Sequence, residues 1–144
     1  MNPNETAIGR FFELYVQKSS VDDIPALVSQ FTDPFLSADP HGARCVRIGD
    51  FAAALPKRKL LFDRLGCKPA VLVNIEETQL DARYSLAKTT WRFDFVRADS
   101  PEHEEVLADS TFLVDTGEVE FKIVMYMAHQ DIMQVLRDRG ILQG

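Results

Sequence analysis

At 144 residues, with 46% hydrophobic and 26% charged residues, the chain has the size and composition of one globular domain, residues 1–144. Its net charge of −6 opposes attraction to phosphate backbones, so nucleic acid is not expected as a partner. It has no apolar run of ~20 residues and no secretory signal pattern, so no membrane contact is expected and a cytoplasmic location is predicted.

Helices are predicted at the start of the chain. Apolar residues recur at helical spacing and predict an amphipathic helix over residues 4–18, with Asn4 as its N-cap. A second helix is expected to follow almost at once and to extend to Phe31.

Prolines and glycines dominate the next segment, from Asp33 to Gly49. They predict irregular chain there, with one short extended piece at 44–48. A third helix is expected over residues 50–65, capped by Asp50. Pro56 should split or kink it, because proline has no amide hydrogen to donate.

Strands are predicted in the second half, where β-branched and aromatic residues recur at period two. The four expected strands, arranged as an antiparallel sheet, cover residues 71–80, 82–96, 106–115 and 119–127. A short final helix follows, with Asp131 as its expected cap. Helices followed by a meander of strands predict an α+β domain in which the helices pack on one sheet face.

Alternation along the strands separates two faces of this sheet. The face expected beneath the helices carries Trp91, Phe93, Phe95, Val106, Ala108, Ser110, Phe112, Val114, Val119, Phe121, Ile123, Met125 and Met127. The opposite face is expected to carry Tyr84, Leu86, Lys88, Arg92, Leu107, Asp109, Leu113, Lys122, Val124 and Tyr126. This second face is too apolar for a comfortable solvent surface and too charged for a core, which predicts a subunit interface and a homodimer.

The segment "FTDPFLSADPHGARC" places Asp39 in a small and apolar run directly before Pro40. A carboxylate near apolar surface is costly unless it is hydrogen-bonded, paired or used for chemistry. Asp39 is therefore a candidate either for a turn, in which its side chain bonds the following backbone, or for catalysis.

Together with Tyr15, Val16, Phe31 and Gly42, the Asp39–Pro40 pair resembles the pattern of ketosteroid isomerase. The order of elements is likewise similar to the NTF2-like superfamily, which also includes SnoaL-type cyclases. This resemblance implies a cone in which a curved antiparallel sheet wraps around the N-terminal helices and leaves an apolar pocket open at one end. It also implies dimerisation through the outer sheet face.

The resemblance implies roles for three residues. Tyr15 corresponds to an oxyanion-hole donor and Asp39 to the base that moves a proton between substrate carbons. The family's third donor falls near Ser110 or Asp109, and alternation places Ser110 on the pocket side. Phe31, Phe35, His41, Trp91, Phe93 and Phe112 are the expected substrate-binding residues.

The expected function is a cofactor-free isomerase, cyclase or dehydratase that acts on a small apolar or carbonyl-bearing molecule by proton transfer. The alternative is a non-catalytic ligand-binding or dimerisation module of the same fold. In that case Tyr15 is a core aromatic and His41 a solvated loop residue. The three histidines lack ligand spacing and no cysteine pair accompanies them, so no metal is expected.

Overall fold

The computed structural model describes residues 6–20, 23–96 and 103–142, with only the backbone described at Ser20. The elements in chain order are α1 (Ala7–Ser20), α2 (Ile24–Val28), β1 (Phe31–Asp39), β2 (Gly42–Val46), α3 (Ile48–Arg64), β3 (Val71–Gln79), β4 (Tyr84–Val96), β5 (His103–Asp115), β6 (Lys122–Ala128) and α4 (Ile132–Asp138). The α+β class expected from the sequence is confirmed.

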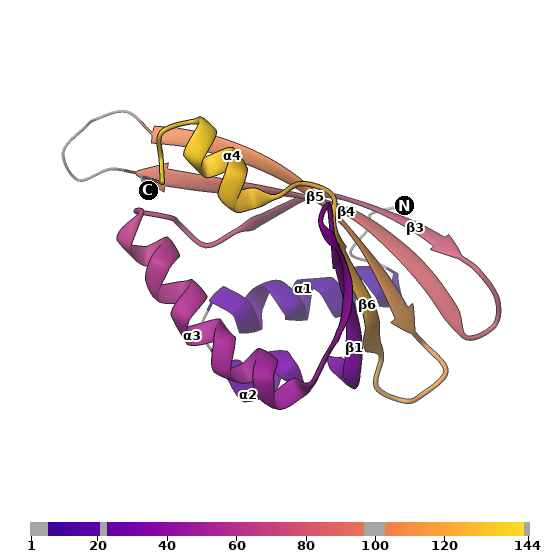
Figure 1. Cartoon of the computed structure of the whole chain (residues 1–144). Coiled ribbons are helices and arrows are strands. Elements are labelled where there is room, and N and C mark those ends of the chain that lie inside the picture. The colour runs from indigo at the N-terminus through magenta and orange to yellow at the C-terminus, as the bar shows by residue number, and fades with distance from the viewer. Residues whose placement is uncertain (1–5, 21–22, 97–102, 143–144) are drawn as a thin grey trace.

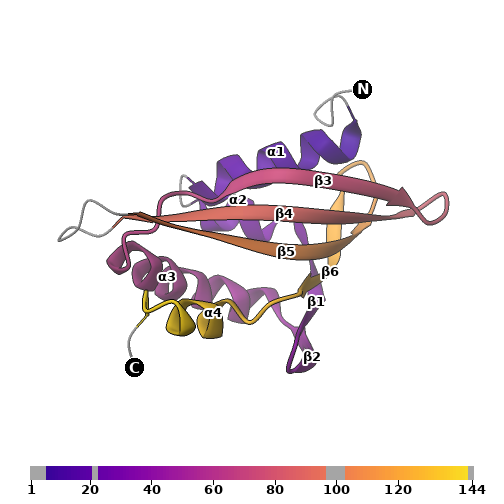
Figure 2. The ribbon, with the colours of Figure 1, turned by 90° about the horizontal axis from the view of Figure 1, so that it is seen from above.

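One curved sheet organises the molecule. In the described part of the chain its strand order is β2-β1-β6-β5-β4-β3, and every pair is antiparallel except the parallel pair of β1 and β6. Figure 1 and Figure 2 show α1, α2 and α3 on the concave side of the long strands, with α4 near the ends of β4 and β5. The helices therefore cover one sheet face and leave the other uncovered.

The segment predicted to be irregular contains a β-hairpin instead. β1 and β2 pair from Phe35 with Val46 to Asp39 with Gly42. The β1–β6 register shifts between Phe31 and Leu36, which is the part of β1 that contains Pro34. Proline has no amide hydrogen for a ladder and is tolerated at such irregularities. The prediction failed because the pairing partner of β1 lies some ninety residues away in β6.

Helix boundaries also differ from those predicted. α2 ends at Val28, and Phe31 begins β1 instead of ending a helix. α3 has Arg47 at its N-cap and runs through Pro56 without interruption. Pro56 is exposed. The carbonyl group four residues earlier, which receives no hydrogen bond from proline, can therefore be hydrated by solvent. The predicted N-cap Asn4 lies outside the described residues.

A β-bulge in β6 reverses the predicted alternation of that strand. Val114 pairs with Ile123, but Leu113 pairs with Met125 and Phe112 with Tyr126, so one residue of β6 has no partner. Tyr126 therefore shares the concave face with Phe112, and their ring centroids are 5.2 Å apart. The prediction that placed Tyr126 on the outer face was wrong, and so were the predictions that placed Met125 and Met127 on the inner face.

The main hydrophobic core lies between α1 and the concave face. Phe12 of α1 has no exposed surface, and its ring lies 4.9 Å from that of Phe112, which is 1% exposed. A second cluster around Phe62, Phe95 and Leu136 joins α3, β4 and α4. Asp131 caps α4 as predicted, because its Oδ1 accepts a hydrogen bond from the Gln134 amide.

The convex face carries a row of aliphatic side chains that crosses four neighbouring strands. The register aligns Leu36, Met125, Leu113 and Leu86, from β1, β6, β5 and β4 respectively. Leu36 is exposed, and the other three are half-buried. We call these four residues the outer apolar row.

Candidate ligand-binding site

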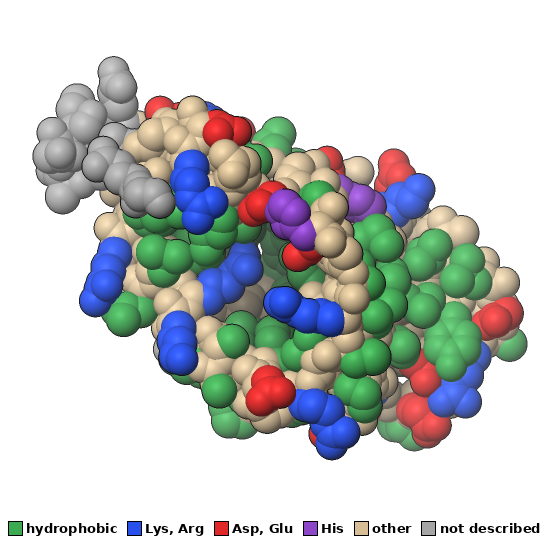
Figure 3. Space-filling model, in the orientation of Figure 1, with side chains coloured by type: hydrophobic (Ala, Val, Ile, Leu, Met, Phe, Trp, Pro, Cys, Tyr) green, Lys and Arg blue, Asp and Glu red, His purple; other side chains and the backbone are tan. Residues whose placement is uncertain are grey.

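A cavity of about 810 Å³ lies between the concave sheet face and the helices, and we call it the main cavity. Figure 3 shows a hollow in the surface, with acidic, basic and histidine side chains around it. The nine site residues predicted from the sequence all line the main cavity. They are Tyr15, Phe31, Phe35, Asp39, His41, Trp91, Phe93, Ser110 and Phe112.

Aromatic rings form the inner wall of the main cavity around Tyr15. The Tyr15 ring centroid lies 5.8 Å from that of Phe112, 5.9 Å from Trp91 and 6.2 Å from Phe31. Phe31 in turn contacts Phe35 at 4.7 Å. Such a wall offers a large apolar contact area with restricted side-chain motion, which suits a flat ring-bearing ligand.

Tyr15 supplies a hydroxyl group to this apolar wall. Burial raises the pKa of Tyr15 above its usual range, Tyr126 raises it further, and the positive charge of Arg58 acts in the opposite direction. The phenol is therefore protonated at neutral pH and can donate a hydrogen bond. Tyr126 was missed as a cavity residue because only the bulge in β6, which the period-two pattern does not reveal, turns it inward.

Ser110 and Asp109 take different environments. Ser110 is 6% exposed on the concave face, and its hydroxyl has no hydrogen-bond partner among the described residues. The Asp109 carboxylate instead accepts hydrogen bonds from Thr90 Oγ1 (2.9 Å) and Gln130 Nε2 (3.3 Å). Of the two candidates for the third hydrogen-bond donor, Ser110 is therefore the one whose side chain is available to a ligand.

Trp91 is held in one orientation on the cavity wall. Its indole Nε1–H donates to Thr89 Oγ1 (2.8 Å), and that hydroxyl donates to the backbone carbonyl of Ser110 (3.0 Å). Trp91 is 7% exposed and is the single tryptophan of the sequence. Its fluorescence is therefore a specific reporter of what enters the main cavity.

Asp39 lies at the rim of the cavity, as the last residue of β1 directly before the turn to β2. Its Oδ1 accepts a hydrogen bond from the His41 amide at 2.8 Å, and the residue is exposed. The carboxylate is thus open to solvent, although the sequence places it in a small and apolar run. The turn interpretation of Asp39 accounts for one of its oxygens, and the other faces no donor among the described residues.

His41 connects the hairpin turn to the start of α4. Its Nε2–H donates to Asp131 Oδ2 at 2.7 Å. The hydrogen bond to Asp131, its negative charge and that of Asp39 all raise the pKa of His41 above its usual value. Both carboxylates therefore favour the protonated form of the imidazole at the rim.

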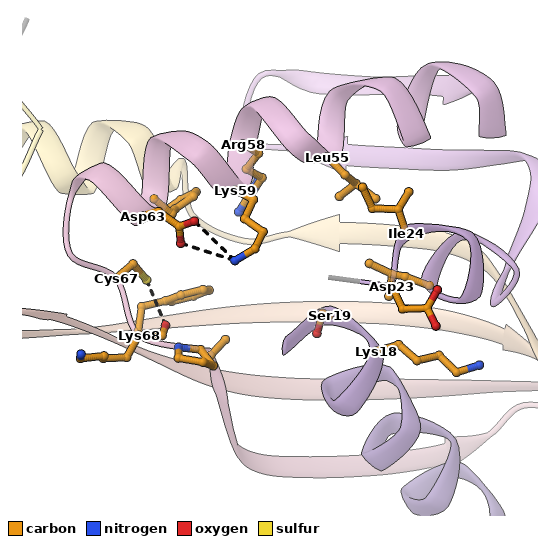
Figure 4. A pocket seen from close by; sticks show the side chains of 15 residues that line it. Lys18, Ser19, Asp23, Ile24, Leu55, Arg58, Lys59, Asp63, Cys67 and Lys68 are labelled. Atoms are coloured by element: carbon orange, nitrogen blue, oxygen red, sulfur yellow. Dashed lines mark hydrogen bonds and ion pairs between the residues drawn. The ribbon is translucent and has the colours of Figure 1, made fainter. Parts of the chain in front are cut away.

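A smaller space of about 220 Å³ adjoins the main cavity, and we call it the side compartment (Figure 4). The two spaces share six lining residues: Ser19, Leu27, Leu55, Arg58, Ala70 and Phe93. Cys67 also lines the side compartment. Burial, followed by the charges of Asp94 and Asp63, raises its pKa to about 11, so the sulfur remains a thiol at neutral pH and is a poor nucleophile.

Within the described ranges, no group of three His, Cys, Asp or Glu residues is arranged to hold a metal ion. The same ranges contain no helix with the length and apolarity to cross a membrane.

Solved structures share this architecture. An NTF-2-like protein of unknown function from Shewanella oneidensis matches with a TM-score of 0.66 at 16% identity, over 85% of this chain and 96% of its own. A ketosteroid isomerase-like protein from Erwinia carotovora matches with a TM-score of 0.65 at 15% identity, over 91% and 98%. The chain has the NTF2-like fold. ActVI-ORFA from Streptomyces coelicolor also matches, with a TM-score of 0.69 at 15% identity, over 87% of this chain and 95% of its own.

The structural matches establish the NTF2-like fold and not the chemistry, because all three identities are low. No protein-family model matches the sequence, and a comparison with curated proteins finds no match. The function must therefore be argued from the cavity of this chain.

Proposed function

We propose that the chain binds a small ring-bearing carbonyl compound in the main cavity and catalyses a cofactor-free proton transfer on it, as an isomerase, cyclase or dehydratase. The observation that carries this proposal is the protonated Tyr15 hydroxyl inside an aromatic cavity of about 810 Å³. A hydrogen-bond donor in apolar surroundings stabilises the oxygen of an enolate much more than it would in water.

The proposed reaction uses one residue at the carbon beside the substrate's carbonyl group and others at the carbonyl oxygen. Asp39 removes a proton from the carbon beside the carbonyl group, and the electron pair of that C–H bond moves onto the oxygen. Tyr15 donates a hydrogen bond to this oxygen, with Ser110 as a second donor. The protonated Asp39 then returns the proton to another carbon of the conjugated system, so that atoms and charge balance.

The test uses a cyclic β,γ-unsaturated ketone and follows the ultraviolet absorbance of the conjugated product. We expect Asp39→Asn to abolish turnover, because asparagine keeps the shape of the side chain but cannot accept the proton. Tyr15→Phe should lower kcat and leave binding nearly unchanged. Turnover at the unmodified rate in Asp39→Asn would contradict the role of Asp39.

A second candidate function is ligand binding without catalysis. It is favoured by the exposure of Asp39 and by the use of its Oδ1 in the hairpin turn. In this case a ring-bearing ketone shifts Trp91 fluorescence, and no carbonyl substrate is turned over. Absence of any Trp91 response to a series of ring-bearing ketones would contradict both functions.

We further propose that the chain forms a homodimer through the convex sheet face. The outer apolar row and the exposed Leu107 form an apolar surface that the helices do not cover. Leu107 pairs with Arg92, which in turn pairs with Val71, so charged and apolar side chains alternate across this surface. A second copy would bury these groups and match their charges.

A further inference from the structure

Arg58 occupies the junction between the main cavity and the side compartment. It is one of the six residues that line both spaces, and it comes from the middle of α3. Its guanidinium carbon lies 5.0 Å from the centroid of the Phe62 ring, which supports the planar group from one side. Figure 4 shows Arg58 extending from α3 toward the compartment.

The positive charge of Arg58 has no ion-pair partner in the part of the chain that the structure describes. Across residues 6–20, 23–96 and 103–142, no carboxylate forms an ion pair with it and no group accepts a hydrogen bond from it. Its neighbour Lys59 is different, because Lys59 Nζ lies 3.5 Å from Asp63 Oδ1. Arg58 therefore presents a full set of donors to the space between the two compartments.

The carboxylates that line the main cavity lie away from Arg58, and most of them accept hydrogen bonds from other residues. Asp39 accepts a hydrogen bond from the His41 amide, and Asp131 accepts one from His41 Nε2–H. Asp109 accepts hydrogen bonds from the side chains of Thr90 and Gln130. Asp50 lies in the first turn of α3, eight residues before Arg58, which is about 12 Å along the helix axis. Acidic groups thus gather at the hairpin end of the cavity, and Arg58 lies at the other end.

We infer that the natural ligand is a ring-bearing carboxylic acid whose carboxylate binds the Arg58 guanidinium, while its rings lie in the main cavity. The site is that of the proposed function, and the inference adds the ligand's charge and orientation. A guanidinium binds a carboxylate through two parallel hydrogen bonds, which fixes orientation as well as affinity. Such an anchor would hold a carbonyl group elsewhere on the ligand between Tyr15 and Asp39.

The position of Tyr15 is consistent with this orientation. Arg58 and Tyr15 both line the main cavity, and the Arg58 charge acts against the effect of burial on the pKa of Tyr15. An anion on Arg58 therefore lies near the Tyr15 end of the aromatic wall. Asp39 at the rim would repel a like charge on the ligand, whereas His41 and Arg44 at the same end would attract one, so the Arg44 variant below tests the opposite orientation.

The experiment compares two probes of the same shape, 2-naphthylacetate and its neutral amide, by isothermal titration calorimetry. The unmodified chain should bind the acid about tenfold more tightly than the amide, equivalent to ~1.4 kcal/mol. Arg58→Gln should remove this preference and leave amide binding within about twofold. Arg58→Lys should restore part of it, because it keeps the charge but not the planar pair of donors.

Arg44 provides the matched control, because it is the other arginine that lines the main cavity and it too has no ion-pair partner in the described ranges. Arg44→Gln should leave the acid preference of the chain intact. Equal binding of acid and amide, or equal loss in both arginine variants, would overturn the inference while the proposed function stands. Failure of both probes and of ring-bearing ketones to bind would overturn the proposed function itself.

Discussion

The concave and convex faces of the long strands are built from alternate residues of the same segments, yet they differ in chemistry. On β5, Phe112 and Ser110 face an aromatic cavity, whereas Leu113 and Leu107 belong to a surface without a helix over it. The concave face combines rings with free hydroxyl groups, and the convex face combines aliphatic side chains with charges. Our proposals of a ligand site on the concave side and an association surface on the convex side rest on this difference.

The largest expected effect concerns the stability that each face contributes. Phe112→Ala should lower the free energy of unfolding by about 3–5 kcal/mol, because it removes a buried ring from the core. Leu107→Ala on the same strand should change it by less than about 1 kcal/mol, since Leu107 is 56% exposed. Urea denaturation at submicromolar concentration, where association is suppressed, measures both. Equal losses in the two variants would refute the assignment of the faces.

The second prediction concerns association through the convex face. Leu113→Asp places a charge in the outer apolar row and should convert a dimer into a monomer in sedimentation velocity experiments, because an unpaired carboxylate in an interface core costs several kcal/mol. Val119→Asp, at a fully exposed position of the β5–β6 loop, is the control and should remain a dimer. Circular dichroism checks that both variants are folded. A monomeric unmodified chain would contradict the proposed homodimer.

The third prediction separates the turn role of Asp39 from a catalytic role at the rim of the concave face. Asp39→Ala removes the acceptor of the His41 amide hydrogen bond and should lower stability by less than about 1 kcal/mol. Asp39→Asn retains an oxygen for that bond and should melt close to the unmodified protein. A large loss of stability in the asparagine variant would show that the negative charge itself is structural.

The smallest expected effect is a pH dependence from the His41–Asp131 pair, which is exposed to solvent. The pKa of His41 is raised, so its contribution is present at acidic pH and is lost as pH rises through the folded-state value. The pKa of Asp131 is lowered by His41 and the Gln134 amide, so its contribution is lost as pH falls through that lowered value. Stability from this pair should therefore be greatest between the two values.

Two measurements check this pair. NMR titration should give His41 a pKa above the ~6.5 of a free histidine. Thermal melts of the unmodified protein should show a small fall in Tm above that pKa, and His41→Gln should remove it. A His41 pKa at or below the free value would contradict the contact with Asp131.

The secondary structure of the second half of the chain follows from its sequence more closely than that of the first half. The period-two pattern predicted the long strands, because alternate residues such as Phe112 and Val114 share one face and are buried there. β1 was not predicted, because its strand character arises from pairing with β6 and not from its own proline-containing sequence. Local signals also predicted that Pro56 would split or kink α3, and the helix is not split there.

The candidate site divides in the same way. The sequence by itself, through its apolar spacing and its resemblance to ketosteroid isomerase, led to nine residues that all line the main cavity. Only the tertiary structure brought Tyr126 inward, because a one-residue bulge shifts every later side chain of β6 to the other face. It also decided that Arg58, on a separate helix, lines the same cavity as Tyr15 and forms no ion pair with a carboxylate of the described residues. Charge pairing depends on distances between segments far apart in the chain, and no local pattern encodes those distances.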